Sequence, residues 1–177
     1  MPRIRTALAL ALALAALTTL VAPAGAITQR RSTRAVALAA AVAAQVNVVR
    51  LQHGLRALRV SVKLNQAAGE HTAQMARRGY FSHSSADGTA FWKRIQRFYG
   101  SGGFRFWSVG ENLLWSSPDV DAPGAIRMWL NSPEHRANLL STQWREVGIS
   151  VVHVPRAGGV YGGRPATIVT SDFGVRR

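Results

Sequence analysis

The stretch EVGISVVHVPRAGGVYGGRPATIVTSDFG, residues 146–174, decides the fold class of this chain. Its two ends, residues 146–154 and 166–174, are rich in β-branched side chains, which favour strands. The middle, residues 155–165, is rich in glycine and proline, which favour turns and loops. We therefore predict two antiparallel strands that are joined by this connection.

The residues before this stretch have a helical pattern instead. Apolar residues that recur three and four apart predict helices, and glycine, threonine and proline mark their ends. The predicted helices cover roughly residues 33–53, 64–79, 89–100 (opened by Thr89) and 121–132, with a short fifth helix that begins at Pro133. Between them, residues 101–115 are predicted to form an irregular strand that leads into a tight turn at Gly110. Helices first and a strand pair last indicate an α+β domain with a small sheet.

The N-terminal segment has the features of a secretion signal peptide. Residues 1–26 combine two early arginines, an apolar run and an Ala-x-Ala cleavage site that ends at Ala26. We expect residues 27–43 to form a flexible arm and the start of the first helix. The apolar run over residues 35–49 is shorter than the roughly 20 residues that a membrane-spanning helix needs. The sequence therefore predicts a secreted, extracellular protein without a transmembrane anchor.

Charge and cysteine content narrow the classes of partner and chemistry. Lysine and arginine number 22 against 8 aspartates and glutamates, which gives a formal net charge of +14. The arginines are scattered among apolar residues and form no dense stripe, so we expect no nucleic-acid partner; lipids or anionic cell-envelope polymers fit such a surface better. The chain has no cysteine. Disulfides, cysteine-ligated zinc and a thiol nucleophile are therefore excluded.

Three residues are candidates for a metal site. His83, in FSHSS, and Glu111, in VGENL, each lie in a turn-rich segment between aromatic residues, where binding residues often occur. His135 follows Ser132 and Pro133, which we predict to cap and open its helix, so the positive end of the helix dipole keeps this imidazole neutral. Two neutral imidazoles and one carboxylate suit zinc or another divalent cation with an open coordination position. Spacing alone does not show that the three side chains meet.

Other sources of chemistry are weaker. HExxH, the G-x-S-x-G nucleophile turn and the glycine-rich phosphate-binding signatures are all absent from the sequence. His71 lies on the apolar stripe of the second predicted helix. We predict that it is a buried histidine, hydrogen-bonded to a neighbouring segment.

Five segments taken together resemble a known family. VNVVRLQHGLRAL, LNQAAGEHTAQMARRGYFSHSSADG, VGENLLW, AIRMWLNSPEHRANLLS and REVGISVV have the order and spacing of the bacterial branch of the CAP superfamily, named for cysteine-rich secretory proteins, antigen 5 and pathogenesis-related 1 proteins. The resemblance covers nearly all of residues 44–174, so we assign a CAP (SCP) domain to residues 44–177. It implies an α-β-α sandwich with a small antiparallel sheet between helical layers.

The resemblance also implies a site. In this family, the residues that correspond to His83, Glu111 and His135 line one open cavity, and some members bind a divalent metal there. Many members have a second acidic residue at the position of Ser132, so their set of four is incomplete in this chain. Some members bind sterols or fatty acids.

Three functions are compatible with these residues. We expect a non-catalytic binding module, because nucleophile motifs are absent and the surface is basic and aromatic; its cavity would hold a divalent metal, or its surface would hold lipid or envelope ligands. A metal-assisted, peptidase-like hydrolase is an alternative, with the ion on His83 and His135 and with Glu111 as general base. In a third interpretation, the three side chains form a structural hydrogen-bond network.

Overall fold

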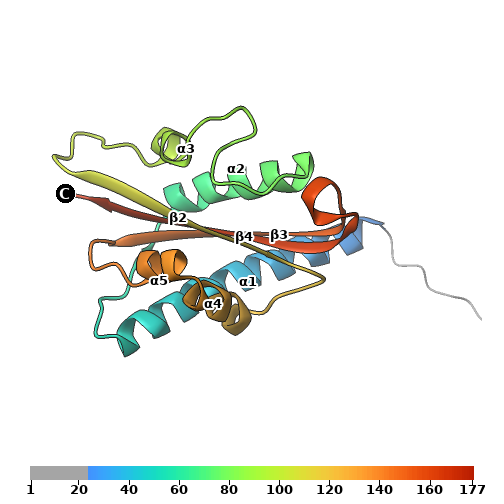
Figure 1. Cartoon of the computed structure of the whole chain (residues 1–177), viewed down its shortest axis with the longest axis horizontal. Helices are drawn as coiled ribbons and strands as arrows, with labels where there is room; N and C mark the ends of the chain where they lie inside the picture. The colour runs from blue at the N-terminus through green and yellow to red at the C-terminus, as the bar shows by residue number, and fades with distance from the viewer. Residues whose placement is uncertain (1–23) are drawn as a thin grey trace, which may run out of the picture.

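The computed structural model describes residues 24–177, and most of the predicted signal peptide lies outside the described residues. Figure 1 shows the order of the elements along the chain. The helices are α1 (Ala24–Gln52), α2 (Val62–Arg78), α3 (Phe91–Phe98), α4 (Ala122–Asn131), α5 (Pro133–Leu139) and the 3-10 turn η1 (Gly159–Tyr161). The strands are β1 (Arg59–Val60), β2 (Trp107–Ser116), β3 (Glu146–Ala157) and β4 (Arg164–Arg176).

The strand pair predicted for residues 146–174 forms the centre of the sheet. β3 and β4 are antiparallel, with a register that runs from Glu146 opposite Gly174 to Ala157 opposite Arg164. β2 is antiparallel to β4 on its other side, and the short β1 is parallel to β3. The strand order β1-β3-β4-β2 confirms the α+β class. The sheet is mixed rather than purely antiparallel, because the chain enters β1 directly from α1 and runs alongside β3.

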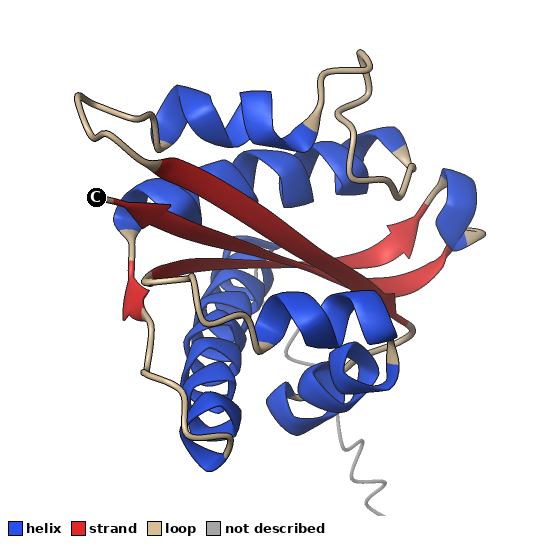
Figure 2. Cartoon of the chain, turned by 60° about the vertical axis from the view of Figure 1, so that its left-hand side comes forward, coloured by secondary structure: helices blue, strands red, loops and turns tan. Residues whose placement is uncertain are grey.

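Helices cover both faces of the sheet, as the resemblance implied. Figures 1 and 2 show α2 and α3 on one face and α1, α4 and α5 on the other. The core under α1 and α4 includes Trp129, Trp144 and Phe173, each at most 3% exposed. Burial of a side chain such as Phe173 contributes about 1.5–3 kcal/mol. The chain is therefore the expected α-β-α sandwich.

The first helix is longer than its apolar pattern predicted. α1 is described from Ala24, so residues assigned to a flexible arm are helical, and the predicted cleavage site lies at its first turn. Its second half belongs to the domain, because Val42, Val46 and Val49 are buried in the core. The part from Ser32 to Gln52 is also long and apolar enough to cross a membrane, by length and composition.

Two predicted local features are wrong. Thr89 does not open α3, because the N-cap position belongs to Ala90, and no side chain caps that helix end. Gly110 does not form a turn, because β2 runs straight through it. A Cβ atom at Gly110 would lie 2.6 Å from Asn138 Oδ1 and 2.7 Å from Trp144 Cζ2. Glycine is needed there for the close approach of α5 and Trp144, which the sequence pattern does not distinguish from a turn.

Candidate functional site

Glu111 is the centre of a buried polar cluster. It lies in the middle of β2, opposite Asp172 of β4, and not in a loop as predicted. Its side chain is 1% exposed. A carboxylate at such a position must be paired or neutralised, because an isolated buried charge is very costly.

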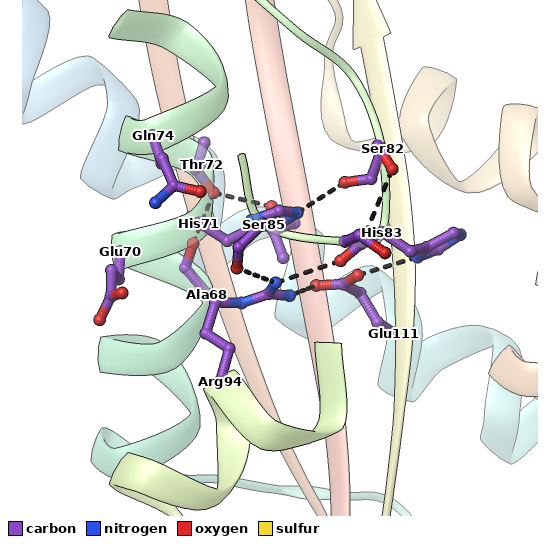
Figure 3. A network of polar contacts seen from close by, with 12 residues as sticks. Ala68, Glu70, His71, Thr72, Gln74, Ser82, His83, Ser85, Arg94 and Glu111 are labelled. Atoms are coloured by element: carbon purple, nitrogen blue, oxygen red, sulfur yellow. Dashed lines mark hydrogen bonds and ion pairs between the residues drawn. The ribbon is translucent and has the colours of Figure 1, made fainter. Parts of the chain in front are cut away.

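Two cationic or proton-donating side chains engage the two carboxylate oxygens of Glu111. His83 Nδ1 lies 2.8 Å from Oε1, and the Arg94 guanidinium contacts Oε2 (Figure 3). Arg94 Nη1 also donates to the carbonyl of His83 at 3.1 Å and to Ser85 Oγ at 3.4 Å. One buried guanidinium therefore ties α3, the loop between α2 and α3, and β2 together.

His83 is the accessible member of the cluster, with a side chain that is 51% exposed. Because a carboxylate only accepts hydrogen bonds, Nδ1 is the ring nitrogen that carries a proton towards Glu111. Phe91 lies edge-on to the imidazole, with ring centroids 6.3 Å apart. His83 is thus oriented by its contact with Glu111.

His71 supports the loop that carries His83, as predicted for a buried histidine. It is fully buried, and its Nε2 donates to the carbonyl of Ser82 at 2.8 Å. Burial lowers the pKa of His71 to about 4; the charge of Glu111 opposes this shift, and that of Arg94 adds to it. His71 is therefore neutral at physiological pH and fixes the backbone next to His83.

Asp172 is a second buried carboxyl group beside Glu111. It is fully buried, and burial followed by the negative charge of Glu111 raises its pKa well above the usual range, although Arg94 opposes the shift. A neutral Asp172 avoids the repulsion between two charged carboxylates at this position. This explains how two acidic residues can face each other across adjacent buried strands.

His135 lies in the first turn of α5, where the sequence predicted it, with Ser132 at the N-cap position. The Ser132 hydroxyl does not cap the helix, however. Burial, followed by the nearby charge of His83, lowers the pKa of His135. The lowered pKa agrees with the neutral imidazole that the sequence predicted. Its largest cause is burial, however, whereas the prediction was based on the helix dipole. The carbonyl of His135 accepts a hydrogen bond of 2.9 Å from Asn112 Nδ2 of β2.

The predicted metal ligands are only partly brought together. His83 and Glu111 are in contact, and His83 is close enough to His135 for its charge to lower the pKa of that imidazole. Among residues 24–177, however, no group of three histidine, aspartate or glutamate side chains is placed to hold a metal ion. Arg94 supplies a positive charge directly at Glu111, where a divalent cation would otherwise be needed. In this arrangement the donor set does not fit a metal, and zinc binding stays a prediction that requires Arg94 to leave Glu111.

Sequence reasoning missed Arg94 and Asp172. Arg94 lies on the apolar stripe of α3. Phe91, Ile95 and Phe98 form the rest of this stripe at helical spacing. An arginine on an apolar stripe was the available signal, since buried arginines need a charged partner. Asp172 interrupts a strand in which every residue from Ala166 to Val175 is buried. That position likewise predicts a perturbed carboxyl group.

A second candidate site is an apolar groove of about 510 Å³ beside β3. β1 pairs with β3 at Glu146 and Val147, so the edge of β3 beyond Val147 is covered by helices and not by a strand within the described part of the chain. α1 lines the groove with Ala35, Val36, Ala39, Ala40, Ala43 and Ala44. Val60, Ile149 and Val151 continue the apolar lining.

The asparagines of this groove already have partners. The Asn47 amide donates to the carbonyl of Leu58 at 3.0 Å and accepts from its N–H at 2.7 Å. Asn65 Oδ1 accepts from the N–H of Ile149 at 2.9 Å. Ser150 is the third polar residue of the lining, and the other lining residues are apolar, so the groove offers a ligand mainly apolar surface.

Comparisons with known proteins agree with this architecture. The family model described as "CAP: Cysteine-rich secretory protein family" matches residues 43–173. Two Bacillus subtilis proteins are similar in sequence: the uncharacterized membrane protein YlbC, 33% identical over 105 residues, and the uncharacterized protein YkwD, 25% identical over 106 residues. These matches cover 59% and 60% of this chain but 29% and 39% of the two relatives, so the chain spans well under half of their length.

Solved structures share the same fold. An extracellular protein containing an SCP domain from Bacillus anthracis superposes with a TM-score of 0.65 at 28% identity, over 84% of this chain and 43% of that chain. An outer surface protein from Borrelia burgdorferi superposes with a TM-score of 0.60 at 20% identity, over 77% of this chain and 90% of that chain. The family match, which extends over most of the described domain, confirms the resemblance found in the sequence. The chain belongs to the cysteine-rich secretory protein (CAP) family, although it contains no cysteine.

Proposed function

We propose that this protein is a non-catalytic binding module that holds an acyl chain, or a ligand of similar shape and polarity, in the groove between α1, α2 and β3. The observation that carries the proposal is the groove of about 510 Å³, whose lining is apolar except for Asn47, Asn65 and Ser150. Small-molecule sites typically have volumes of about 300–1,000 Å³ and mainly apolar walls. The groove has the size and the polarity of such a site.

The energetics of the groove favour a long apolar ligand. Each methylene group transferred from water contributes about 0.8 kcal/mol. The exposed alanines on α1 keep the groove open, since larger side chains at Ala40 and Ala44 would fill it. A ligand with a polar head would place the head in solvent at the open side.

The polar cluster supports this choice over a hydrolase. A general base needs a carboxylate oxygen that can take a proton from water, but both oxygens of Glu111 contact side chains of the protein. These contacts favour a supporting role for the cluster, which is the third interpretation of the sequence.

The place of action that fits this proposal is the outside of the cell. The Bacillus anthracis neighbour is described as extracellular, whereas the relative YlbC is described as a membrane protein. An N-terminal segment typical of a secretion signal and the apolar Ser32–Gln52 helix fit export. We propose release from the membrane after cleavage near Ala26, because the second half of α1 is committed to the core.

Displacement of a fluorescent fatty acid tests the ligand class. The protein is expressed in a host that exports and processes it, and the purified product is titrated with cis-parinaric acid. Unlabelled palmitate is then added as competitor. We expect saturable binding with displacement. Ala40→Phe fills the groove and should weaken binding at least tenfold, whereas the matched control Ala41→Phe, on an exposed position outside the groove lining, should bind as the parent does.

Two results would reject the acyl-chain proposal. One is a folded parent protein that neither enhances the fluorescence of the probe nor retains lipid after extraction. The other is equal binding by the parent, Ala40→Phe and Ala41→Phe, which would move the ligand away from the groove.

A further inference from the structure

Two aromatic side chains are exposed at the end of the sheet where β2 begins and β4 ends. Phe104 is 48% exposed and Phe106 is 39% exposed, in the segment that connects α3 to β2. This segment is at the same end of the molecule as the C-terminal residues (Figure 1). Phe106 and Arg177 exchange backbone hydrogen bonds of 2.8 and 3.1 Å, and the N–H of Phe104 donates to the carbonyl of Ser101 at 2.8 Å. The backbone that presents the rings is therefore held in place.

Arginine side chains lie against these rings. The guanidinium carbon of Arg176 is 5.3 Å from the ring centre of Phe104 and 3.9 Å from that of Tyr99. The guanidinium carbon of Arg177 is 4.8 Å from the ring centre of Phe106. Cations at such distances are attracted to the ring faces. Each exposed phenylalanine is thus paired with a positive charge.

The excess of positive charge at this end is large. Arg59 of β1 lies beside Glu146 of β3. Glu146 in turn lies opposite Gly174 of β4, two residues before Arg176. Glu146 is the carboxylate in this group, and it already contacts Arg59 at 3.6 Å and Arg176 at 3.9 Å. Arg105 and Arg177 add two exposed guanidinium groups. One shared carboxylate cannot neutralise these arginines.

We propose that Phe104, Arg105, Phe106, Arg176 and Arg177, which we call the aromatic–arginine end, dock the protein on a bilayer that contains anionic lipids. Phenylalanine side chains enter the boundary between headgroups and acyl chains, and guanidinium groups pair with lipid phosphates. The positive charge suits an anionic surface, because a zwitterionic lipid balances its phosphate with its own cation and attracts the arginines less than a lipid with net negative charge. Basic residues near an anionic membrane each strengthen binding substantially.

The aromatic–arginine end also lies near one end of the apolar groove. Val60, which lines the groove, belongs to β1 and lies beside the row of Glu146. Docking through this end would bring that part of the groove close to the bilayer. The docking proposal does not depend on the acyl-chain proposal, and different substitutions test the two.

Vesicle co-sedimentation tests the docking. The protein processed by an exporting host is mixed with vesicles of phosphatidylcholine alone, or with about 30% phosphatidylglycerol, at low and high salt. We expect binding to the anionic vesicles that decreases with salt. Phe104→Ser with Phe106→Ser should weaken it at least tenfold, and Arg105→Gln with Arg177→Gln by about 25-fold at low salt, or about fivefold for each arginine.

The control pair is Arg127→Gln with Met128→Ser, on exposed positions of α4 across the sheet from α3. It should bind as the parent does. The apolar helix α1 is present in the parent and in all three variants, so any binding by α1 is the same in each. The differences between the four proteins therefore report on the aromatic–arginine end. The proposal is overturned if the parent binds both vesicle types equally or binds neither. It is also overturned if the control loses as much as the aromatic pair, or if soluble polyglutamate is bound but anionic vesicles are not. Unchanged thermal unfolding of each variant shows that it is folded.

Discussion

The polar cluster around Glu111 and the apolar groove beside β3 differ in the surface that they leave to a ligand. In the cluster, a buried carboxylate, a buried guanidinium and a half-exposed imidazole contact one another across three segments, although Arg94 Nε has no hydrogen-bond partner among the described residues. In the groove, the Asn47 amide and the Oδ1 atom of Asn65 are bonded to backbone groups, and the rest of the lining is apolar except for Ser150. The cluster therefore contributes to the fold, whereas the groove leaves surface available for a ligand.

The largest expected effect tests whether the cluster is part of the scaffold. Arg94→Met leaves the buried Glu111 carboxylate without its guanidinium, and Glu111→Gln leaves the guanidinium without its carboxylate. Removing one partner of a buried ion pair costs about 3–5 kcal/mol of unfolding free energy. Urea denaturation should show a loss of this size for each variant, and a loss for the double variant that is smaller than the sum.

Arg97→Met is the matched control on α3. Arg97 pairs with Glu70, but its side chain is 56% exposed, and exposed pairs contribute about 0–1 kcal/mol. If Arg94→Met costs no more than Arg97→Met, the cluster does not hold the fold together.

The next effect concerns the pH dependence of stability. The folded-state pKa of His71 is lowered to about 4, so the unfolded chain binds the proton more readily, and stability falls as pH decreases from about 6.5 towards 4. The shifted pKa of His71 changes the free energy of unfolding by about 3 kcal/mol at most over this pH range. Asp172 has the opposite effect on the pH dependence. Its raised pKa keeps it neutral in the folded chain, whereas it ionises in the unfolded chain. The contribution of Asp172 to the free energy of unfolding is therefore lost as the pH rises above the usual carboxyl range.

Asp172→Asn separates the two groups. The amide resembles the neutral acid in shape and cannot ionise, so the variant should lose the opposing contribution. We expect the melting temperature of Asp172→Asn to rise more steeply between pH 4 and 7 than that of the parent. Parallel pH profiles would mean that Asp172 does not titrate differently in the folded and unfolded chains.

Zinc addition tests the predicted metal site against the ion pair. A ligand that binds only the folded state stabilises it by about 2.7 kcal/mol at 100 times its dissociation constant. While Arg94 holds Glu111, we expect no shift in the melting temperature of the chelator-treated parent with zinc, magnesium or calcium. Arg94→Gln should respond to zinc through His83 and Glu111, and His83→Ala in the same background should abolish the response. A zinc response of the parent that His83→Ala abolishes would contradict this expectation and place a metal site at the cluster.

The difference between cluster and groove also explains which features the sequence could predict. The strand pair and α2 follow from local periodicity, and Gly79 ends α2 with a φ of 68° as a C-terminal glycine should. The contact between His83 and Glu111 could be anticipated from the family resemblance. Arg94 and Asp172 could not be placed by composition rules, because charged residues are read as exposed unless their position on an apolar stripe is weighed. The groove depends on the absence of side-chain volume along α1, which an alanine-rich helix does not reveal by itself.

The smallest expected effect separates ligand binding from stability. Ala40 lines the groove but is exposed, so Ala40→Phe should change the free energy of unfolding by no more than about 0.5 kcal/mol, as should Ala41→Phe. Urea denaturation of both variants beside the fatty-acid titration gives the two quantities for the same proteins. A loss of binding without a loss of stability would assign the groove to ligand binding. A loss of more than about 2 kcal/mol in Ala40→Phe alone would instead mean that the groove closes in solution and that α1 packs there as core, since overpacking a filled core costs about 1–3 kcal/mol.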